Sequence, residues 1–459
     1  MTDRPTSGVS RRGLLTGLLA GGAAAAAAPL VAPAIAGAAD PPRPTPATPN
    51  AFTFFSDPDL NFQALFMVGA SGYGAAEAGE VLTTFDRVHE RGDSYVAFYE
   101  EFLREGRRLR ELGDRWRARG QRASAKSAYL RSAMYLDQPL FYALATSRPT
   151  RAHEGALYRE MERSWALAAS QAGPSWKQVK IPYGSTTLPG WLLTADGAGR
   201  RSRRPTIILN NGSDAQNIDM WVYGGAAALE RGWNALIFEG PGQGANLFLR
   251  NIVFRPDWEQ VITPVVDFLR ARPEVDRRRI ALAGQSFGGY LVQRAAAYEH
   301  RLAGVVADPG AIDCFVSWSS SLPRAMLELL AAGRKAEFDG YWAEAQKEFS
   351  PQMRFQLAKR SEIYGSGSFY DRMKLASQFR LTPAESRRIT SPTAILSPAQ
   401  EQFFPGQPEE AYKRLTVKRK ALIRFTAAEG AQFHCEPMAP QLRNERVYDW
   451  LERNLQPTK

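Results

Sequence analysis

The stretch Gly284-Gln285-Ser286-Phe287-Gly288-Gly289 decides the fold, because it sets a serine between glycines in the pattern G-x-S-x-G. Residues 275–283 before it have the pattern of a turn and a short buried strand, and residues 287–300 after it that of a helix. A strand, a sharp turn and a helix together project a serine hydroxyl at the top of a sheet. A side chain in place of either flanking glycine would crowd the backbones that meet in such a turn. Ser286 is therefore predicted to be a nucleophile.

A serine hydroxyl needs a base to take its proton, and histidine is the usual one. The chain has four histidines. His434 follows a strand-like run, Lys420 to Phe425, and precedes an amphipathic closing helix from about Pro440 to Leu455. The others lie in helical regions upstream or at the far end of the helix that follows the serine: His89, His153 and His300. We therefore predict that His434 is the base.

A third residue, an acid, should orient the imidazole and stabilise its cation. Glu401 comes shortly after the strand-like run Pro392 to Pro398, between the serine and the histidine in sequence. Asp308, at the end of the preceding strand Leu302 to Ala307, is the alternative acid. Glu401 is preferred, and Asp308 stays open at this point.

The tetrahedral intermediate of acyl transfer needs backbone N–H donors for its oxyanion. The residue after the nucleophile, Phe287, is the first candidate. The loop Asn210 to Asp214, after the strand Thr206 to Leu209, offers the N–H of Ser213 as the second.

These residues resemble the α/β-hydrolase superfamily, and one branch fits further segments. Phe238-Glu239-Gly240-Pro241-Gly242-Gln243-Gly244 resembles the D-G-P-G-Q-G segment of dihydroxypseudooxynicotine hydrolase and its relatives, among them fungal pigment-pathway hydrolases that shorten polyketide chains. The loop around Glu429 to Cys435 resembles the histidine loop of that group, and Gln121 to Ala133 resembles part of its N-terminal helical domain. Glu239 and Asn211 depart from the group's pattern without touching the triad.

The resemblance implies a doubly wound, mostly parallel sheet of the α/β-hydrolase class with an N-terminal helical domain and a helical cap. Residues 51–173 lack strand alternation and show apolar residues at helical spacing, which predicts the helical domain. Strands and helices then alternate in the core, 174–459. The alternation stops over about 310–390, and this aromatic-rich stretch is predicted to form the cap over Ser286.

The N-terminus has the pattern of an export signal. Arg11-Arg12 precedes a weakly apolar run with small-residue cleavage sites, so residues 1–39 are predicted to be a twin-arginine signal that engages the export machinery. Prolines and glycines in the run disfavour a stable membrane anchor. Residues 40–50 form a proline-rich linker. We expect the protein to be secreted or otherwise extracytoplasmic.

Composition excludes several other classes. The net charge of +11 is scattered and accompanies no nucleic-acid-binding motif. The Gly240 to Gly244 run lacks the glycine spacing of a dinucleotide loop, and no Cys/His cluster indicates a metal, so no cofactor and no metal are expected. The two cysteines, Cys314 and Cys435, leave one disulfide open.

The sequence therefore predicts an exported serine hydrolase that cleaves an ester or related acyl bond of a small organic substrate. A carbon–carbon bond hydrolase that acts beside a ketone is the alternative, since the resembled group includes such enzymes. A peptidase and a non-catalytic hydrolase-like binding protein are weaker alternatives. The oligomeric state is left open.

Overall fold

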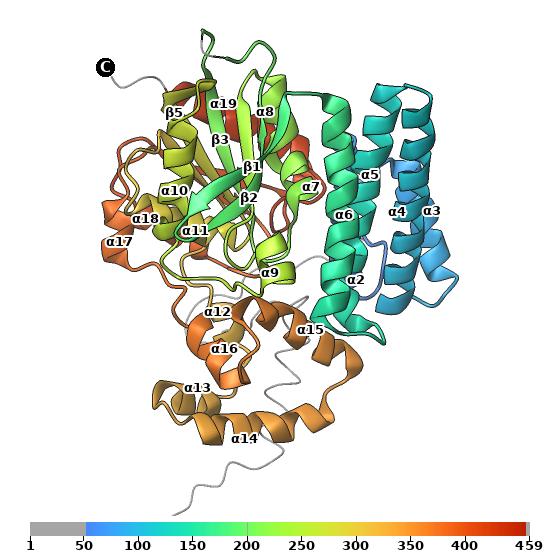
Figure 1. Ribbon diagram of the computed structural model, residues 1–459. Helices are drawn as coiled ribbons and strands as arrows, with labels where there is room; N and C mark the ends of the chain where they lie inside the picture. Colours follow the sequence, from blue (N-terminus) through green and yellow to red (C-terminus); the bar gives the residue numbers. More distant parts are fainter. Residues whose placement is uncertain (1–51, 200, 456–459) are drawn as a thin grey trace, which may run out of the picture.

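The computed structural model describes residues 52–199 and 201–455 (Figure 1). The predicted export signal, 1–39, and the linker, 40–50, lie outside these residues.

The described chain begins with a bundle of helices that packs along one side of the sheet (Figure 1). Its helices are α2 (Pro58–Gly69), α3 (Ala78–His89), α4 (Tyr95–Ala118), α5 (Arg122–Phe141) and α6 (Arg151–Ala172), with the short 3-10 helices η1 (Ala70–Tyr73) and η2 (Ala143–Ala145). Ser94 caps α4 and Thr150 caps α6 through their side-chain oxygens. The apolar residues at helical spacing on α4 belong to the hydrophobic core, because Phe98, Phe102 and Leu109 are fully buried.

The core is one sheet, eight-stranded within the described residues, in the order β1-β2-β4-β3-β5-β6-β7-β8. The strands are β1 (Trp176–Tyr183), β2 (Thr186–Leu193), β3 (Arg204–Asn210), β4 (Asn234–Phe238), β5 (Val275–Gln285), β6 (Gly304–Asp308), β7 (Thr393–Pro398) and β8 (Lys420–Phe425). β1 and β2 form a hairpin and pair antiparallel, as do β2 and β4, whereas the pairs from β4 to β8 are parallel. The mostly parallel sheet is thus confirmed.

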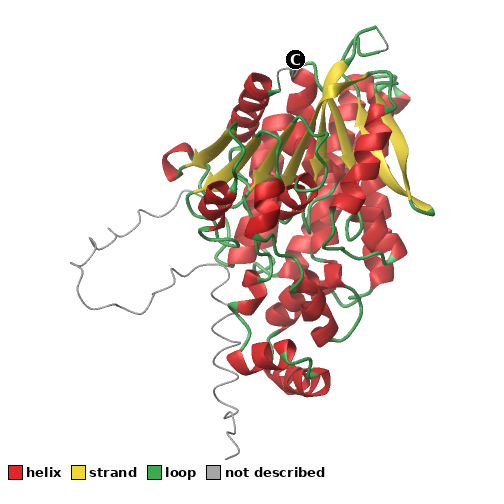
Figure 2. Cartoon of the chain, turned by 90° about the vertical axis from the view of Figure 1, so that its left-hand side faces the viewer, coloured by secondary structure: helices red, strands yellow, loops and turns green. Residues whose placement is uncertain are grey.

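Helices cover both faces of the sheet, as Figure 2 shows. α10 and α11 pack against β5, while α8 packs on β4 and α19 on β6. The core helices are α7 (Asn217–Met220), the π-helix η3 (Trp221–Gly225), α8 (Ala226–Glu230), α9 (Gly244–Arg250), α10 (Glu259–Arg270), α11 (Gly288–Ala296), α18 (Gln407–Arg414), the 3-10 helix η6 (Ala427–Glu429) and α19 (Pro440–Asn454). Because parallel strands end at one edge, the loops after β3, β5, β7 and β8 meet there.

Most of a helical insertion between β6 and β7 lies below that edge in Figure 1, while its last helix lies beside the core. It contains α12 (Val316–Ser319), α13 (Arg324–Ala331), α14 (Lys335–Ala345), η4 (Gln346–Glu348), α15 (Pro351–Ser361), η5 (Glu362–Tyr364), α16 (Phe369–Ala376) and α17 (Pro383–Arg388). This is the cap that the aromatic-rich stretch predicts. Among the described residues, no helix is long and apolar enough to cross a bilayer.

Candidate active site

Ser286 stands on the sharp turn between β5 and α11. Its φ is +58°, a left-handed conformation that non-glycine residues adopt only where the surroundings hold it. A Cβ on Gly284 would lie 2.1 Å from the carbonyl oxygen of Gly288, and one on Gly288 would lie 2.7 Å from that of Asn210. Both glycines are therefore needed for the turn. The helix after it is shorter than predicted, since α11 ends at Ala296 and leaves His300 beyond it.

The structure brings Ser286, His434 and Glu401 into one chain of hydrogen bonds. His434 Nε2 lies 2.9 Å from Ser286 Oγ, and His434 Nδ1 lies 2.8 Å from both carboxylate oxygens of Glu401. The histidine and glutamate side chains are each only 4% exposed. A proton on Nδ1 that faces Glu401 leaves Nε2 free to accept the serine proton. The other histidines contact different partners elsewhere: His89 contacts Asp93, His153 contacts Tyr99 and His300 contacts Thr390.

Hydrogen bonds from backbone N–H groups hold the side chain of Glu401 and the loop of His434 in place. Glu401 Oε1 accepts hydrogen bonds from the N–H groups of Phe403, at 2.9 Å, and Phe404, at 3.0 Å. Gln402 Oε1 accepts the N–H of His434 at 3.0 Å, which ties the loop after β7 to the loop after β8. Sequence reasoning did not name Gln402, although it stands next to the predicted acid.

Asp308 does not contact the imidazole. Its carboxylate accepts a hydrogen bond from Arg443 Nε of α19 at 2.8 Å, and both side chains are buried. Burial raises the pKa of Asp308, while Arg443 opposes that rise. The carbonyl oxygen of Asp308 accepts the N–H of Ser286 at 2.5 Å. The geometry thus gives the position beside His434 to Glu401 and leaves Asp308 to support the turn, so Asp308 as alternative acid finds no support.

The two predicted oxyanion donors lie beside the serine. Ser213 and Phe287 line the same cavity as Ser286. A Cβ on Gly212 would lie 2.9 Å from Ser286 Cβ and 3.0 Å from the nitrogen of Phe287, so the loop after β3 rests directly on the turn. Within the described residues, the N–H groups of Ser213 and Phe287 have no acceptor. Both donors are therefore available to an incoming oxygen atom.

Gln243 positions this loop, and sequence reasoning missed it. Its Nε2 donates to the carbonyl oxygens of Asn211, at 2.8 Å, and Gly212, at 3.2 Å, while its Oε1 accepts the N–H of Gly240 at 2.8 Å. The signal was present in the quoted run Gly240 to Gly244, where a glutamine stands between glycines. The turn after β4 thus fixes the loop that carries Ser213.

The departure at Glu239 connects the core to the helical bundle. Both carboxylate oxygens accept the hydroxyl of Tyr158 on α6, at 2.7 and 2.9 Å. One also accepts the N–H of Ala245, and Asn217 donates to the other. Burial raises the pKa of Glu239 to about 7.

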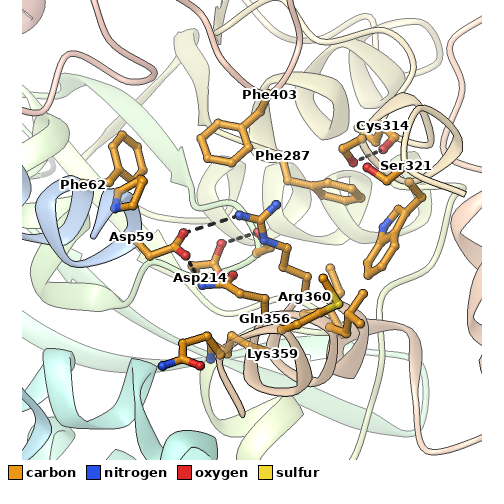
Figure 3. Close-up of a pocket in the computed structure, with 18 of the residues that line it drawn as sticks. Asp59, Phe62, Asp214, Phe287, Cys314, Ser321, Gln356, Lys359, Arg360 and Phe403 are labelled. Atoms are coloured by element: carbon orange, nitrogen blue, oxygen red, sulfur yellow. Dashed lines mark hydrogen bonds and ion pairs between the residues drawn. The ribbon is translucent and has the colours of Figure 1, made fainter. Parts of the chain in front are cut away.

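Ser286 opens into a cavity of about 560 Å³ between the core, the cap and α2 (Figure 3). Phe62 of α2 is part of its wall, and its ring centre lies 6.4 Å from that of His434. Sequence reasoning named no residue of the helical domain as part of the site. The apolar lining is Phe62, Phe287, Trp318, Leu322, Trp342, Met353, Leu357, Ile363, Tyr364, Phe369, Phe403 and Phe404.

The two cysteines are both buried and free, so the disulfide that the sequence left open does not form in this structure. Cys314 lines the cavity, whereas Cys435 Sγ lies 3.7 Å from the carbonyl oxygen of Asp308. In the part of the chain that the structure describes, no three His, Cys, Asp or Glu side chains group so as to hold a metal ion.

Known proteins share this architecture. The chain is 33% identical to "Alpha/beta hydrolase psoB" of Aspergillus fumigatus, over 87% of this chain and 94% of that protein. It is 27% identical to "20-hydroxy-prefusarin hydrolase FUS2" of Gibberella moniliformis, over 87% and 97% of the two chains. The crystal structure of 2,6-dihydroxy-pseudo-oxynicotine hydrolase superposes with a TM-score of 0.62 at 18% identity, over 85% of this chain and 98% of that one.

Residues 211–449 match the family described as "Alpha/beta hydrolase family". That range contains the loop after β3, the turn at Ser286, the cap and both loops that carry Glu401 and His434. The fold, the resembled branch and the hydrolases among its relatives agree, and the chain belongs to the alpha/beta hydrolase family as a hydrolase enzyme.

Proposed function

We propose that this hydrolase uses Ser286, His434 and Glu401 to cleave an ester or related acyl bond of a small organic substrate. The observation that carries the proposal is the hydrogen-bonded chain of these side chains, which opens into an aromatic-lined cavity of about 560 Å³. A cavity of this size suits a small molecule.

The chemistry would proceed in two displacements. Ser286 Oγ bonds to the carbonyl carbon as its proton passes to His434 Nε2, and Glu401 stabilises the imidazolium. The N–H groups of Ser213 and Phe287 bind the oxyanion. The leaving alkoxide takes the proton from His434, and a water molecule, deprotonated in turn by His434, releases the acyl group from Ser286.

A fluorophosphonate probe tests this proposal, because it phosphonylates activated serines. We expect labelling of the wild-type protein and none of Ser286→Ala or His434→Ala. The control is Ser213→Ala, which keeps the backbone N–H and should still label. Labelling that persists in Ser286→Ala, or a folded wild-type protein that does not label, would count against the proposed nucleophile.

Cleavage of a carbon–carbon bond beside a ketone is the second candidate, and the aromatic lining of the cap favours it. Trp318 and Tyr364 reach the cavity from the cap, where they would stack on an aryl ketone. A panel of β-diketones and acyl-phenols, assayed beside short esters, separates the two candidates by kcat/KM. Turnover confined to the esters would reject this candidate.

We also propose that residues 1–39 direct export by the twin-arginine machinery. The support is the sequence alone, Arg11-Arg12 before a weakly apolar run. Residues 1–50 fused to a reporter should be exported, and the double change Arg11→Lys and Arg12→Lys should retain the reporter in the cytoplasm. Equal export of both fusions would argue against this route.

A further inference from the structure

Arg360 of α15 brings a cation to the wall of the cavity. Its guanidinium carbon lies 5.5 Å from the centre of the Phe403 ring, and that ring lies 4.7 Å, centre to centre, from the imidazole of His434. Figure 3 shows the guanidinium directed into the cavity between Asp59 and Phe403. One aromatic ring therefore separates this cation from the catalytic base that we propose.

The hydrogen-bond donors of Arg360 are unused. Within the described residues, its guanidinium makes no hydrogen bond, and its nearest carboxylate oxygen is Asp59 Oδ1 at 3.8 Å. That distance is an ion pair but too long for a hydrogen bond. Asp59 Oδ2 already accepts hydrogen bonds from Tyr95 and Gln356. Asp59 thus supplies a counter-charge, while all five N–H donors of Arg360 stay free.

The neighbouring cation is used differently. Lys359 donates to Glu362 at 2.8 Å and is buried, so its charge is already matched. The other carboxylates that line the cavity are also engaged: Asp57 accepts the N–H groups that begin α2, and Asp214 accepts the hydroxyl of Ser213. Among the charged side chains that line this cavity, Arg360 therefore has hydrogen-bond donors that remain free to bind a ligand.

A free guanidinium fork fits one kind of ligand best. Its paired N–H groups match the two oxygens of a carboxylate, and a charge-assisted bidentate pair is among the strongest polar contacts in proteins. We propose that Arg360 binds a carboxylate of the substrate, so that the site acts on acyl compounds that carry an acidic group. This proposal rests on the proposed function and deepens it, because it names the substrate class.

A binding experiment tests Arg360 without turnover. In the Ser286→Ala protein at about pH 7, where a carboxylic acid is ionised, calorimetry compares phenylbutyrate with its neutral amide, phenylbutyramide. We expect the carboxylate to bind about 10- to 100-fold more tightly than the amide, and the further change Arg360→Met to remove that preference. Arg354→Met is the matched control, since Arg354 lies on the same helix outside the cavity lining and should leave the preference intact.

Two results would overturn the proposal. One is equal affinity for the carboxylate and the amide in the protein that carries Arg360. The other is a carboxylate preference that survives Arg360→Met, which would assign the anion to another group such as His434. Arg360→Lys keeps the positive charge beside Asp59, so it serves as a second variant in case Arg360→Met does not fold. It should weaken carboxylate binding several-fold, because a lysine lacks the paired N–H donors of a guanidinium.

A kinetic experiment separates this proposal from the proposed function. With para-nitrophenyl butyrate and the acidic ester para-nitrophenyl hydrogen glutarate as a pair, Arg360→Met should lower kcat/KM for the acidic ester about 10-fold more than for the neutral one, whereas Ser286→Ala should abolish turnover of both. An inactive Arg360→Met protein that still folds would give Arg360 a general rather than a specific role and so overturn the inference. Residual turnover by Ser286→Ala would instead refute the proposed nucleophile and leave the binding result standing.

Discussion

Among the individual residues, Glu401 has the most constrained surroundings. Two backbone N–H groups fix one of its oxygens, and both oxygens face His434 Nδ1 at 2.8 Å. A buried carboxylate in this position selects the imidazole tautomer with the proton on Nδ1 and stabilises the imidazolium that forms during proton transfer. An amide would keep the shape but remove the charge.

Glu401→Gln should therefore lower kcat by about 1,000- to 10,000-fold on any ester that the wild-type protein cleaves, with little change in KM. Steady-state kinetics measures this, and circular dichroism checks the fold. Glu410→Gln, on the exposed face of α18, is the control and should retain activity. If Glu401→Gln lowered kcat only slightly and a folded Asp308→Asn protein lost most of its kcat, Asp308 would instead be the acid.

The loop after β3 leaves no room for a side chain at Gly212, because a Cβ there would approach the turn at Ser286 to 2.9 Å. We expect Gly212→Ala to displace the Ser213 N–H and to lower kcat by about 100-fold or more, as loss of an oxyanion donor does. Gly340→Ala is the control, since a Cβ at that position meets nothing within 4 Å. Unchanged kcat in Gly212→Ala would exclude this loop from the oxyanion site.

Between elements, α6 joins the helical bundle to the sheet through acidic side chains. Glu162 accepts hydrogen bonds from Trp191 Nε1 of β2, at 2.9 Å, and from Asn217 of α7, also at 2.9 Å. Burial, and then the nearby charge of Glu239, raise the pKa of Glu162 to about 8. Near neutral pH, Glu162 is therefore protonated in the folded protein, whereas the same side chain is ionised in the unfolded chain.

The sign of the pH effect follows. An acid whose pKa rises on folding stabilises the protein most below its unfolded pKa, and that contribution is lost as the pH rises through the folded pKa. A glutamine cannot ionise, so Glu162→Gln should remove the loss of stability that Glu162 causes at high pH. We expect the free energy of unfolding to rise by on the order of 1 kcal/mol relative to wild type at about pH 8.5 and to stay unchanged at about pH 4. Denaturant unfolding at both pH values measures this. Glu111→Gln, at an exposed position of α4, should show no such difference. An equal effect of Glu162→Gln at both pH values would refute the proton linkage.

Across the whole molecule, the N-terminal helices, the core and the cap enclose one site. Trp221 Nε1 donates to the carbonyl oxygen of Tyr73, and Gln441 of α19 donates to that of Gly72. Arg151 of α6 pairs with Glu362 of the cap at 2.9 Å. Segments from the two ends of the described chain and from its middle are therefore packed together.

This packing predicts that residues 52–455 unfold as one cooperative unit. Calorimetry of the protein should give a single transition, and Tyr158→Phe, which removes the hydroxyl between α6 and Glu239, should shift it to lower temperature without splitting it. Activity against an ester should disappear in the same temperature range. Two separated transitions would show that the helical bundle and the sheet are independent.

At each scale, the sequence by itself determined the features that depend on neighbouring residues in the chain. The run at Ser286 fixes a strand, a turn and a helix, because only glycine fits beside a serine with a positive φ. Chain order then pointed to Glu401 and His434, since the loops after parallel strands share one edge of a sheet. The helical domain followed from apolar residues at helical spacing, and the parallel core from the alternation of strands and helices.

Only the tertiary structure decided which residues from distant segments meet. Asp59, Phe62 and Arg360 reach the cavity from α2 and α15, and Gln243 reaches the loop after β3 from the turn after β4. It also put Glu401 rather than Asp308 beside His434, because Arg443 of α19 pairs with the aspartate carboxylate. Sequence periodicity records whether a residue is buried but not what it is buried against, since that depends on contacts between segments hundreds of residues apart.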